Sequence, residues 1–219
     1  MLVFDNIHIF LWNNSTTNNC NAFFIDGDKK ILIDPGHDHL LEHVRDHLGA
    51  LSLSLEDVDV IIITHGHPDH LEGVRSFRGS STLIAIHELE LEFVKNEASH
   101  YVESMGLIDF EPDILLKAGE LIIGDIRLQI IHTPGHSPGS FCLYWPDRKA
   151  LFTGDVVFNQ GVGRTDLPGG DGQALKESIR TISQFDVEYL LPGHGEPISG
   201  RDLVRSNFAD IERVWFEYL

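Results

Sequence analysis

The sequence predicts an α/β protein in which two sheets pack face to face and helices cover their outer faces. Two observations favour this class. Short runs rich in β-branched and aromatic residues recur along the chain and end at Gly, Pro, Asp or Ser, as strands do. Elsewhere, apolar residues follow the helical period. No linker or low-complexity segment interrupts the chain, so we expect residues 1–219 to form a single domain.

The predicted elements differ in order between the two halves of the chain. Strands open the first half and then alternate with helices, whereas the second half has a run of strands followed by helix, strand and helix. The expected strands cover residues 21–26, 30–34, 58–64, 81–86, 120–124, 126–131, 140–145, 149–154 and 187–191. The expected helices cover residues 38–49, 69–78, 88–99, 173–184 and 200–217. Asp171 is placed to cap the fourth of these helices.

The charge balance excludes several kinds of partner. The 219 residues include 34 acidic and 16 basic ones, giving a formal net charge of −18. Such a chain repels phosphate backbones and anionic membranes, so we expect no nucleic acid and no membrane as partner. No apolar run approaches the roughly 20 residues of a membrane span, and the N-terminus lacks the basic start of a secretion signal. Cys20 and Cys142 have apolar neighbours, which favours two reduced, buried thiols in a cytoplasmic protein.

The stretch THGHPDH at residues 64–70 concentrates groups that bind metals. It follows an apolar run typical of a buried strand, and its proline suits the first turn of a helix, where a missing N–H costs least. Ligands of α/β proteins bind at such strand ends. His65 and His67 can point the same way, whereas Asp69 and His70 diverge by about 100° on a forming helix. The stretch therefore predicts two neighbouring binding points.

Further candidate ligands follow strands or lie in glycine turns downstream. His136 lies in TPGHSPG, Asp155 follows FTG, and His194 lies in PGHG. Glycine lets the backbone bend sharply and so aims the next side chain. With the first cluster these residues make seven donors, which is too many for one tetrahedral zinc ion and fits two ions that share a carboxylate. Imidazole and carboxylate donors without thiolate suit zinc, iron or manganese.

This series of motifs resembles the metallo-β-lactamase superfamily. H-x-H-x-D-H is followed, in the same order, by His in TPGHSPG, Asp in FTGD and His in PGHG. The resemblance spans nearly the whole chain and is strongest to the hydroxyacylglutathione hydrolase (glyoxalase II) group. It implies a four-layer αβ/βα sandwich of two packed mixed sheets with outer helices. It also implies two divalent metal ions, with zinc as the expected metal and iron or manganese as the alternatives.

The resemblance assigns a role to each matching position. Six ligands divide between two metals: His65, His67 and His136 on the first, and Asp69, His70 and His194 on the second. Asp155 would bridge the metals, and Asp34, after the strand at 30–34, would orient ligands rather than bind. Asp69 and Asp155 would be the catalytic carboxylates, with a metal-bound hydroxide as the nucleophile.

These roles imply a hydrolase of a small acyl thioester or ester. Hydroxide would attack the carbonyl, and the cations would stabilise the oxyanion. β-Lactamases similar to this chain carry Cys at the position of Asp155, and diiron oxygen reducers carry Glu at the position of His67. We therefore expect a glyoxalase II-like thioesterase. The alternatives are a persulfide dioxygenase with a single iron, a lactonase or other ester hydrolase of the same fold, and a non-enzymatic metal-binding module.

Two segments near the expected site keep two interpretations each. Arg164, in GVGRTDLPGGD, could bind a substrate carboxylate or form an ion pair with Asp166. Residues 96–107 fit either a wall of the substrate pocket or a connecting loop.

Two helices raise further questions. His39, His43 and His47 are four residues apart, which predicts one helix face that is either solvated or a further metal site. In the helix at 200–217, apolar residues at helical spacing favour packing on the core over a substrate or dimer surface. A homodimer is compatible with the sequence.

Overall fold

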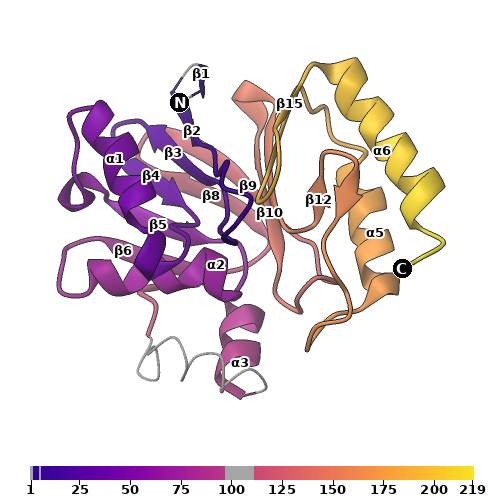
Figure 1. Cartoon of the computed structure of the whole chain (residues 1–219), viewed down its shortest axis with the longest axis horizontal. Helices are drawn as coiled ribbons and strands as arrows, with labels where there is room; N and C mark the ends of the chain where they lie inside the picture. The colour runs from indigo at the N-terminus through magenta and orange to yellow at the C-terminus, as the bar shows by residue number, and fades with distance from the viewer. Residues whose placement is uncertain (1, 5, 97–110) are drawn as a thin grey trace.

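Two sheets lie against each other, and helices cover the outer side of each (Figure 1). The computed structural model describes residues 2–4, 6–96 and 111–219. Within these residues, one sheet has seven strands in the order β1-β2-β3-β4-β5-β6-β7. The other has six strands in the order β15-β14-β11-β10-β9-β8. The predicted α/β class, with two packed sheets and outer helices, is confirmed.

The first sheet comes from the N-terminal half of the chain. Its strands are β1 (Leu2–Phe4), β2 (Ile7–Phe10), β3 (Ala22–Asp26), β4 (Lys30–Ile33), β5 (Val60–Ile63), β6 (Leu83–His87) and β7 (Ile114–Leu116). Its helices are α1 (Glu42–Ala50), α2 (Pro68–Leu71) and α3 (Glu88–Asn96), with 3-10 turns η1 (Asp38–Leu40), η2 (Leu55–Asp57) and η3 (Glu72–Phe77). Strands β1 to β4 pair antiparallel, and β4 to β7 pair parallel, so the sheet is mixed.

The second sheet comes from the C-terminal half and is also mixed. Its strands are β8 (Gly119–Ile123), β9 (Ile126–His132), β10 (Phe141–Trp145), β11 (Ala150–Gly154), β14 (Tyr189–Pro192) and β15 (Ile198–Ser199). The 3-10 turn η4 (Pro146–Arg148), the small hairpin of β12 (Val157–Phe158) and β13 (Gly161–Val162), and the helices α5 (Gly172–Ile182) and α6 (Arg201–Trp215) complete it. Only β11 and β14 pair parallel in this sheet, within the described residues.

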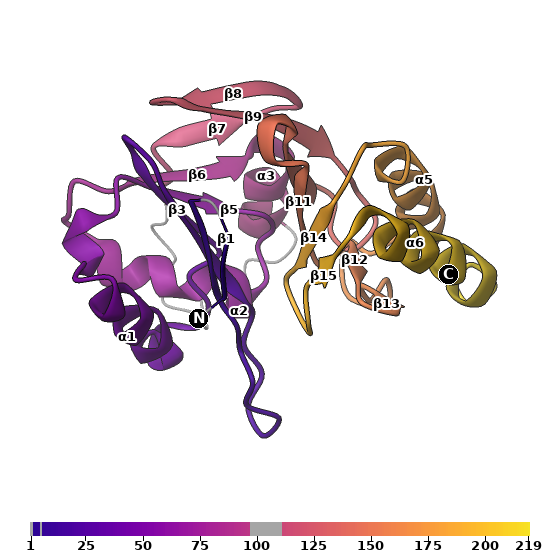
Figure 2. The same cartoon turned by 90° about the horizontal axis from the view of Figure 1, so that it is seen from above.

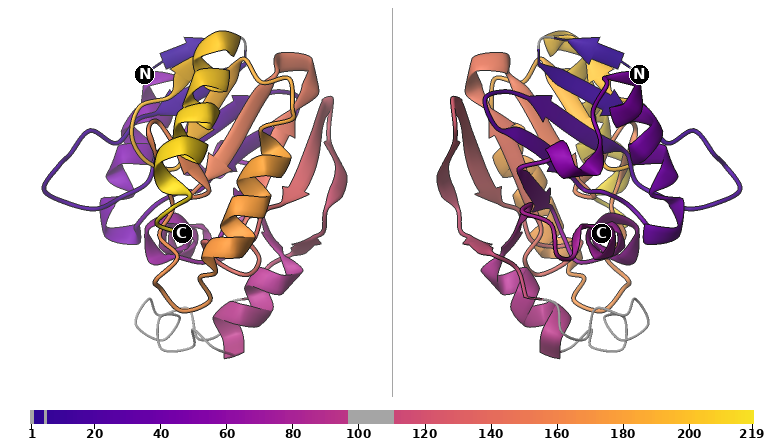
Figure 3. Two further views of the ribbon diagram at one scale, coloured as in Figure 1. Left: turned by 90° about the vertical axis from the view of Figure 1, so that its right-hand side faces the viewer. Right: turned by 90° about the vertical axis from the view of Figure 1, so that its left-hand side faces the viewer.

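Three apolar layers hold the four layers of backbone together. The central one lies between the sheets, where Phe23 of β3 meets Phe152 of β11 edge to face at 5.3 Å between ring centroids. A second layer joins the first sheet to α1, α2 and α3, and a third joins the second sheet to α5 and α6. Seen from above and from either side, the two helix layers lie on opposite outer faces (Figures 2 and 3). The two sheets thus share a core, while the division into domains stays a prediction.

The predicted helix at 69–78 differs from the observed one for a local reason. Residues 68–71 are α-helical, but Glu72–Phe77 is a 3-10 turn. The N–H of Gly73 donates to the carbonyl of Gly36 at 2.7 Å instead of continuing the α-helical ladder. A Cβ at position 73 would come within 2.9 Å of that same carbonyl oxygen, so the close approach requires glycine.

The other elements follow the predicted pattern with shifted ends. Asp171 caps α5 by accepting a hydrogen bond from the Ala174 N–H at 2.9 Å, as predicted. In α6, Val204, Phe208 and Ile211 pack on the core as expected, whereas Val214 and Trp215 near the end of the helix are exposed. The strands that were not predicted are short and carry little periodic signal: β1, β2, β7, β12, β13 and β15.

Two other expectations can be compared with the structure. Cys20 and Cys142 are free and buried, as predicted. None of the helices among the described residues is long and apolar enough to span a membrane. Of the segment at 96–107, residues 97–107 lie outside the described residues.

Candidate metal centre

The seven predicted ligands come from loops at the ends of strands. β5 ends at Ile63 and delivers the stretch 64–70 into the start of α2, where Pro68 is the first helical residue. His136 lies between β9 and β10, Asp155 directly follows β11, and His194 lies just beyond β14. Hydrogen bonds between loops hold this edge together. The Phe141 N–H donates to the Thr64 carbonyl at 3.3 Å, and the Gly193 N–H donates to the Gly154 carbonyl at 2.8 Å.

The structure gathers these seven side chains into one centre. Among the described residues, three overlapping groups have ligand atoms within 4.8 Å of one another: His65/His67/His136, Asp69/His70/His194 and His65/His70/Asp155. Gly193 allows this crowding, because a Cβ there would lie 2.4 Å from Asp155 Oδ1 and 2.8 Å from the His70 ring. The two triads match the division that the resemblance implies.

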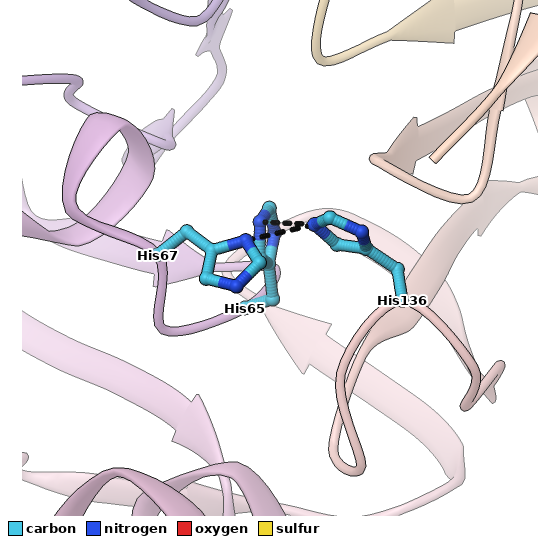
Figure 4. A group of neighbouring side chains, drawn as sticks. All are labelled: His65, His67 and His136. Carbon is cyan, nitrogen blue, oxygen red and sulfur yellow. Dashed lines mark hydrogen bonds between the residues drawn. The ribbon is translucent and has the colours of Figure 1, made fainter. Parts of the chain in front are cut away.

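Three imidazole rings converge in the first triad (Figure 4). Nε2 of His136 lies 3.2 Å from Nε2 of His65 and 2.8 Å from Nδ1 of His67. Nδ1 of His136 donates to the Arg164 carbonyl at 2.7 Å, so in the neutral ring Nε2 carries a lone pair. Nδ1 of His65 lies 3.1 Å from the Thr64 hydroxyl, which likewise leaves its Nε2 free. Lone pairs that face one another at these distances fit a shared cation.

Burial keeps these rings neutral. It lowers the pKa of His65 well below its usual value, with a further contribution from the neighbouring His70, His136 and His67 rings. It lowers the pKa of His67 to about 4 and also lowers that of His136. Neutral imidazole is the state that ligates a metal, so the triad can bind a cation at neutral pH without first losing protons.

Asp155 joins the first triad to the second. Its Oδ2 lies 3.6 Å from His136 Nε2 and 3.4 Å from His194 Nε2, and its Oδ1 lies 3.2 Å from His70 Nε2. Asp69 Oδ2 lies 3.3 Å from the same His194 nitrogen. Oδ1 of Asp155 is buried and has no hydrogen-bond donor of acceptable geometry among the described residues. A buried carboxylate oxygen without a donor is costly, and a bound cation would satisfy it.

The second triad carries more negative charge than the first. Burial lowers the pKa of His70, but the carboxylates of Asp155 and Asp34 raise it further, so the net pKa lies well above the usual value. Burial also lowers the pKa of His194, but the Asp155 carboxylate and the hydrogen bonds to Asp155 and Asp69 raise it to about 9. A divalent cation bound between these rings and carboxylates would take the place of such protons. The donor set thus fits two cations with Asp155 between them, while the role of each ligand stays a prediction.

Asp34 contacts the second triad through the His70 ring and also binds Thr64. Its Oδ1 accepts from the Thr64 N–H at 2.8 Å, and its Oδ2 accepts from the Thr64 hydroxyl at 2.7 Å and from His70 Nδ1 at 2.8 Å. Because Nδ1 of His70 donates to Asp34, its Nε2 faces the centre, where loss of its proton would leave a lone pair for a cation. These contacts are compatible with a residue that orients ligands, and that role of Asp34 stays a prediction.

Two residues that the sequence did not reveal hold the ligand loops. Glu90 of α3 is buried and accepts from the N–H of Gly66 at 2.6 Å, from the hydroxyl of Ser137 at 2.7 Å and from the N–H of Gly139 at 2.8 Å. It therefore connects the loop of His65 and His67 to the loop of His136. The signal was an acidic residue three positions before the apolar Phe93.

The second residue is Asn18. Its side-chain amide donates to Asp69 Oδ2 at 2.7 Å.

Arg164 shows one of its two expected contacts. Its Nε and Nη2 both donate to the Asp166 carboxylate at 2.9 Å, and both side chains are largely exposed. This ion pair raises the pKa of Arg164 and lowers that of Asp166. Its backbone carbonyl, rather than its side chain, reaches His136. Binding of a substrate carboxylate by Arg164 stays a prediction.

The predicted face of three histidines is wrong. His39 lies in the 3-10 turn η1, whereas His43 and His47 lie in α1. His43 is half-buried and donates from Nε2 to the Phe10 carbonyl at 2.9 Å, and the His47 ring stacks on the Phe10 ring at 4.8 Å. Leu41 interrupts the helix between His39 and the other two, so the four-residue spacing does not correspond to one face.

Comparison with known proteins places this centre in a family. A profile of the metallo-beta-lactamase superfamily matches residues 15–194. A probable metallo-hydrolase of Methanocaldococcus jannaschii is 34% identical over 186 residues, which are 80% of this chain and 87% of the relative. A hydroxyacylglutathione hydrolase (GloC) of Haemophilus influenzae is 32% identical over 197 residues, 86% of this chain and 91% of the relative.

A solved structure gives the same answer. The crystal structure of the B3 metallo-beta-lactamase BLEG-1 has a TM-score of 0.74 and 30% identity to this chain, over 91% of this chain and 95% of that one. The four-layer architecture therefore recurs in a known fold. The chain belongs to the metallo-β-lactamase superfamily, among its metallo-hydrolases.

Proposed function

We propose that this protein is a dinuclear metal-dependent thioesterase of the hydroxyacylglutathione hydrolase type, acting on a small acyl thioester. The observation that supports this most is the pair of triads joined by Asp155. The similarity to a hydroxyacylglutathione hydrolase over most of both chains supports the substrate class.

The chain's own residues prepare the reaction. Two divalent cations, expected to be zinc, would supply a hydroxide at neutral pH and polarise the carbonyl oxygen. Asp34 and Glu90 set the orientation of the ligand side chains, and Asn18 holds Asp69. A thiolate leaves without needing a strong general acid, because thiols have a pKa of about 8.5.

A cysteine nucleophile does not compete with this route. Burial raises the pKa of Cys142 to about 12, and burial with the nearby carboxylates raises that of Cys20 well above its usual value. Both thiols are therefore neutral and inaccessible at physiological pH. Among the described residues no other thiol is present to replace the hydroxide.

A polar pocket lies beside the centre. It has a volume of about 300 Å³ and is lined by His194, Gly195 and the loop that precedes β3. This loop contributes Trp12 together with amide and hydroxyl side chains such as that of Asn18. This volume is at the small end of ligand pockets. The amide and hydroxyl groups favour a short acyl group that carries a hydroxyl over a long alkyl chain.

A panel of substrates tests the proposal. We expect the zinc-loaded protein to hydrolyse lactoylglutathione, and Asp155→Asn to lose this activity. Asp147→Asn serves as the control, because Asp147 is an exposed carboxylate in the turn η4 and belongs neither to a triad nor to the Arg164 ion pair. Failure of the wild-type protein on every thioester and lactone would refute the proposal.

The same panel separates the competing functions. Oxygen consumption with a glutathione persulfide by a protein with one iron would establish the persulfide dioxygenase instead. Hydrolysis of a β-lactam without thioester turnover would favour the activity named for the structural relative.

A further inference from the structure

A second group of metal-binding side chains lies outside the dinuclear centre. His37 and His39 flank the start of η1, and Glu72 opens η3. Their ligand atoms lie within 4.8 Å of one another. None of the three is assigned a role by the reaction, and none belongs to either triad.

The distances suit a single small cation. Nδ1 of His37 lies 2.7 Å from Glu72 Oε2, and Nδ1 of His39 lies 3.9 Å from the same oxygen. Ligands bound tetrahedrally at about 2.0–2.1 Å from one zinc ion would be about 3.4 Å apart. Since all three atoms lie within 4.8 Å of one another, changes of at most about 1.5 Å in any separation would bring them into position. The contact between His37 Nδ1 and Glu72 Oε2 is a hydrogen bond, and a cation would replace its proton.

The backbone holds two of the ligands in place. The His37 N–H donates to the Asn19 side-chain carbonyl at 2.8 Å. The Gly73 N–H, one residue after Glu72, donates to the Gly36 carbonyl at 2.7 Å. The side chains of His37 and Glu72 are only 18% and 16% exposed, so their positions are restricted. A preorganised pair lowers the entropy cost of binding.

The third ligand leaves the group open to solvent. The His39 side chain is 68% exposed and can turn toward the cation, and water can complete the coordination. The nearest basic residue of η3, Arg75, lies beside the Asp38 carboxylate at 3.9 Å, which partly offsets its charge. Two imidazoles and one carboxylate are a donor set that first-row divalent metals prefer over calcium or magnesium.

We propose that His37, His39 and Glu72 form a third, solvent-accessible binding site for zinc or a similar first-row divalent metal. The proposal does not depend on the thioesterase function. The site lies on the segments that also carry the dinuclear centre, since Glu72 follows His70 by two residues and His37 follows Asp34 by three. A metal ion bound by His37, His39 and Glu72 would therefore restrain the two segments that carry Asp34 and His70.

Equilibrium dialysis of the zinc-loaded protein against increasing free zinc tests the proposal. We expect the wild type to bind a third equivalent that is weaker than the first two. His39→Gln should weaken that third equivalent by at least about 10–100-fold, as loss of a metal-site partner does. Glu72→Gln should do the same. His47→Gln, which removes a half-buried histidine from the adjacent helix, is the matched control and should keep it.

The outcomes decide between a built site and surface binding. His39 is exposed, so His39→Gln should retain the fold, two metal equivalents and basal hydrolysis. Loss of the third equivalent in His39→Gln and Glu72→Gln, but not in His47→Gln, supports the site. A wild type that never binds a third zinc, or variants that bind it as tightly as the wild type, would overturn the proposal.

Discussion

Glu90 provides the sharpest test of how the first triad is built. Its carboxylate accepts three hydrogen bonds, from Gly66, Ser137 and Gly139, and these donors belong to the two loops that present the three histidines. Burial raises the pKa of Glu90, while the three hydrogen bonds oppose the shift. Substitution of this side chain should therefore loosen both loops at once.

The magnitude follows from the donors that are left without an acceptor. A Gln side chain at position 90 keeps the shape, but its NH₂ group must face at least one backbone N–H. Each buried donor without a partner costs about 1–3 kcal/mol, so Glu90→Gln should destabilise the protein by about that amount. Glu90→Ala removes the acceptor of all three hydrogen bonds and should cost about 3–5 kcal/mol.

Metal binding distinguishes this positioning role from a purely structural one. We expect Glu90→Gln to weaken the zinc ion of the first triad about 10–100-fold and the other zinc ion less. Glu90 accepts hydrogen bonds from Gly66, between His65 and His67, and from the loop of His136, whereas Asp69 and His70 lie further along in α2. A zinc titration against a competing chelator measures both affinities. Glu92→Gln, an exposed substitution on the same helix, is the control. Two affinities equal to those of the control, or an equal loss at both sites, would refute the argument.

Three other perturbations extend the test. Asp34→Asn removes the charged acceptor of the His70 ring and should lower zinc affinity about 10–100-fold; a titration that matches the wild type would contradict this. Arg164→Ala should raise KM for glutathione thioesters at constant kcat. An unchanged KM would show that Arg164 forms the ion pair with Asp166 but does not bind the substrate. Cys20 and Cys142 should resist a thiol reagent at about pH 8 until the protein unfolds, because their raised pKa values keep both thiols neutral. Fast labelling of the native protein would show that they are accessible.

The sequence predicted the longer buried strands and the helical segments, but it missed the short strands, such as β1 and β2, and misplaced some helix ends. Buried strands such as Val60–Ile63 consist of uninterrupted β-branched residues, and this pattern survives in any context. The end of α2 depends instead on a contact between Gly73 and the loop of Gly36, which are far apart in sequence. The face of three histidines failed for a similar reason, since Leu41 breaks the helix after η1.

The candidate ligands were predictable because chemistry restricts them. Histidine and aspartate at strand ends have few structural uses in such number, and their order along the chain carries the resemblance. Glu90 was not predictable in this way. Its role depends on the approach of α3 to two loops, one of them about 50 residues further along, and a single glutamate in a helix is usually a solvated one.

The number of zinc ions required for activity tests the central claim most directly. Metal-free protein would receive measured amounts of zinc, and hydrolysis of a small hydroxyacyl thioester would be followed at each addition. A dinuclear centre predicts no activity without metal and a rise that ends at two ions per chain. Full activity at one ion per chain, or activity in the metal-free protein, would contradict the account.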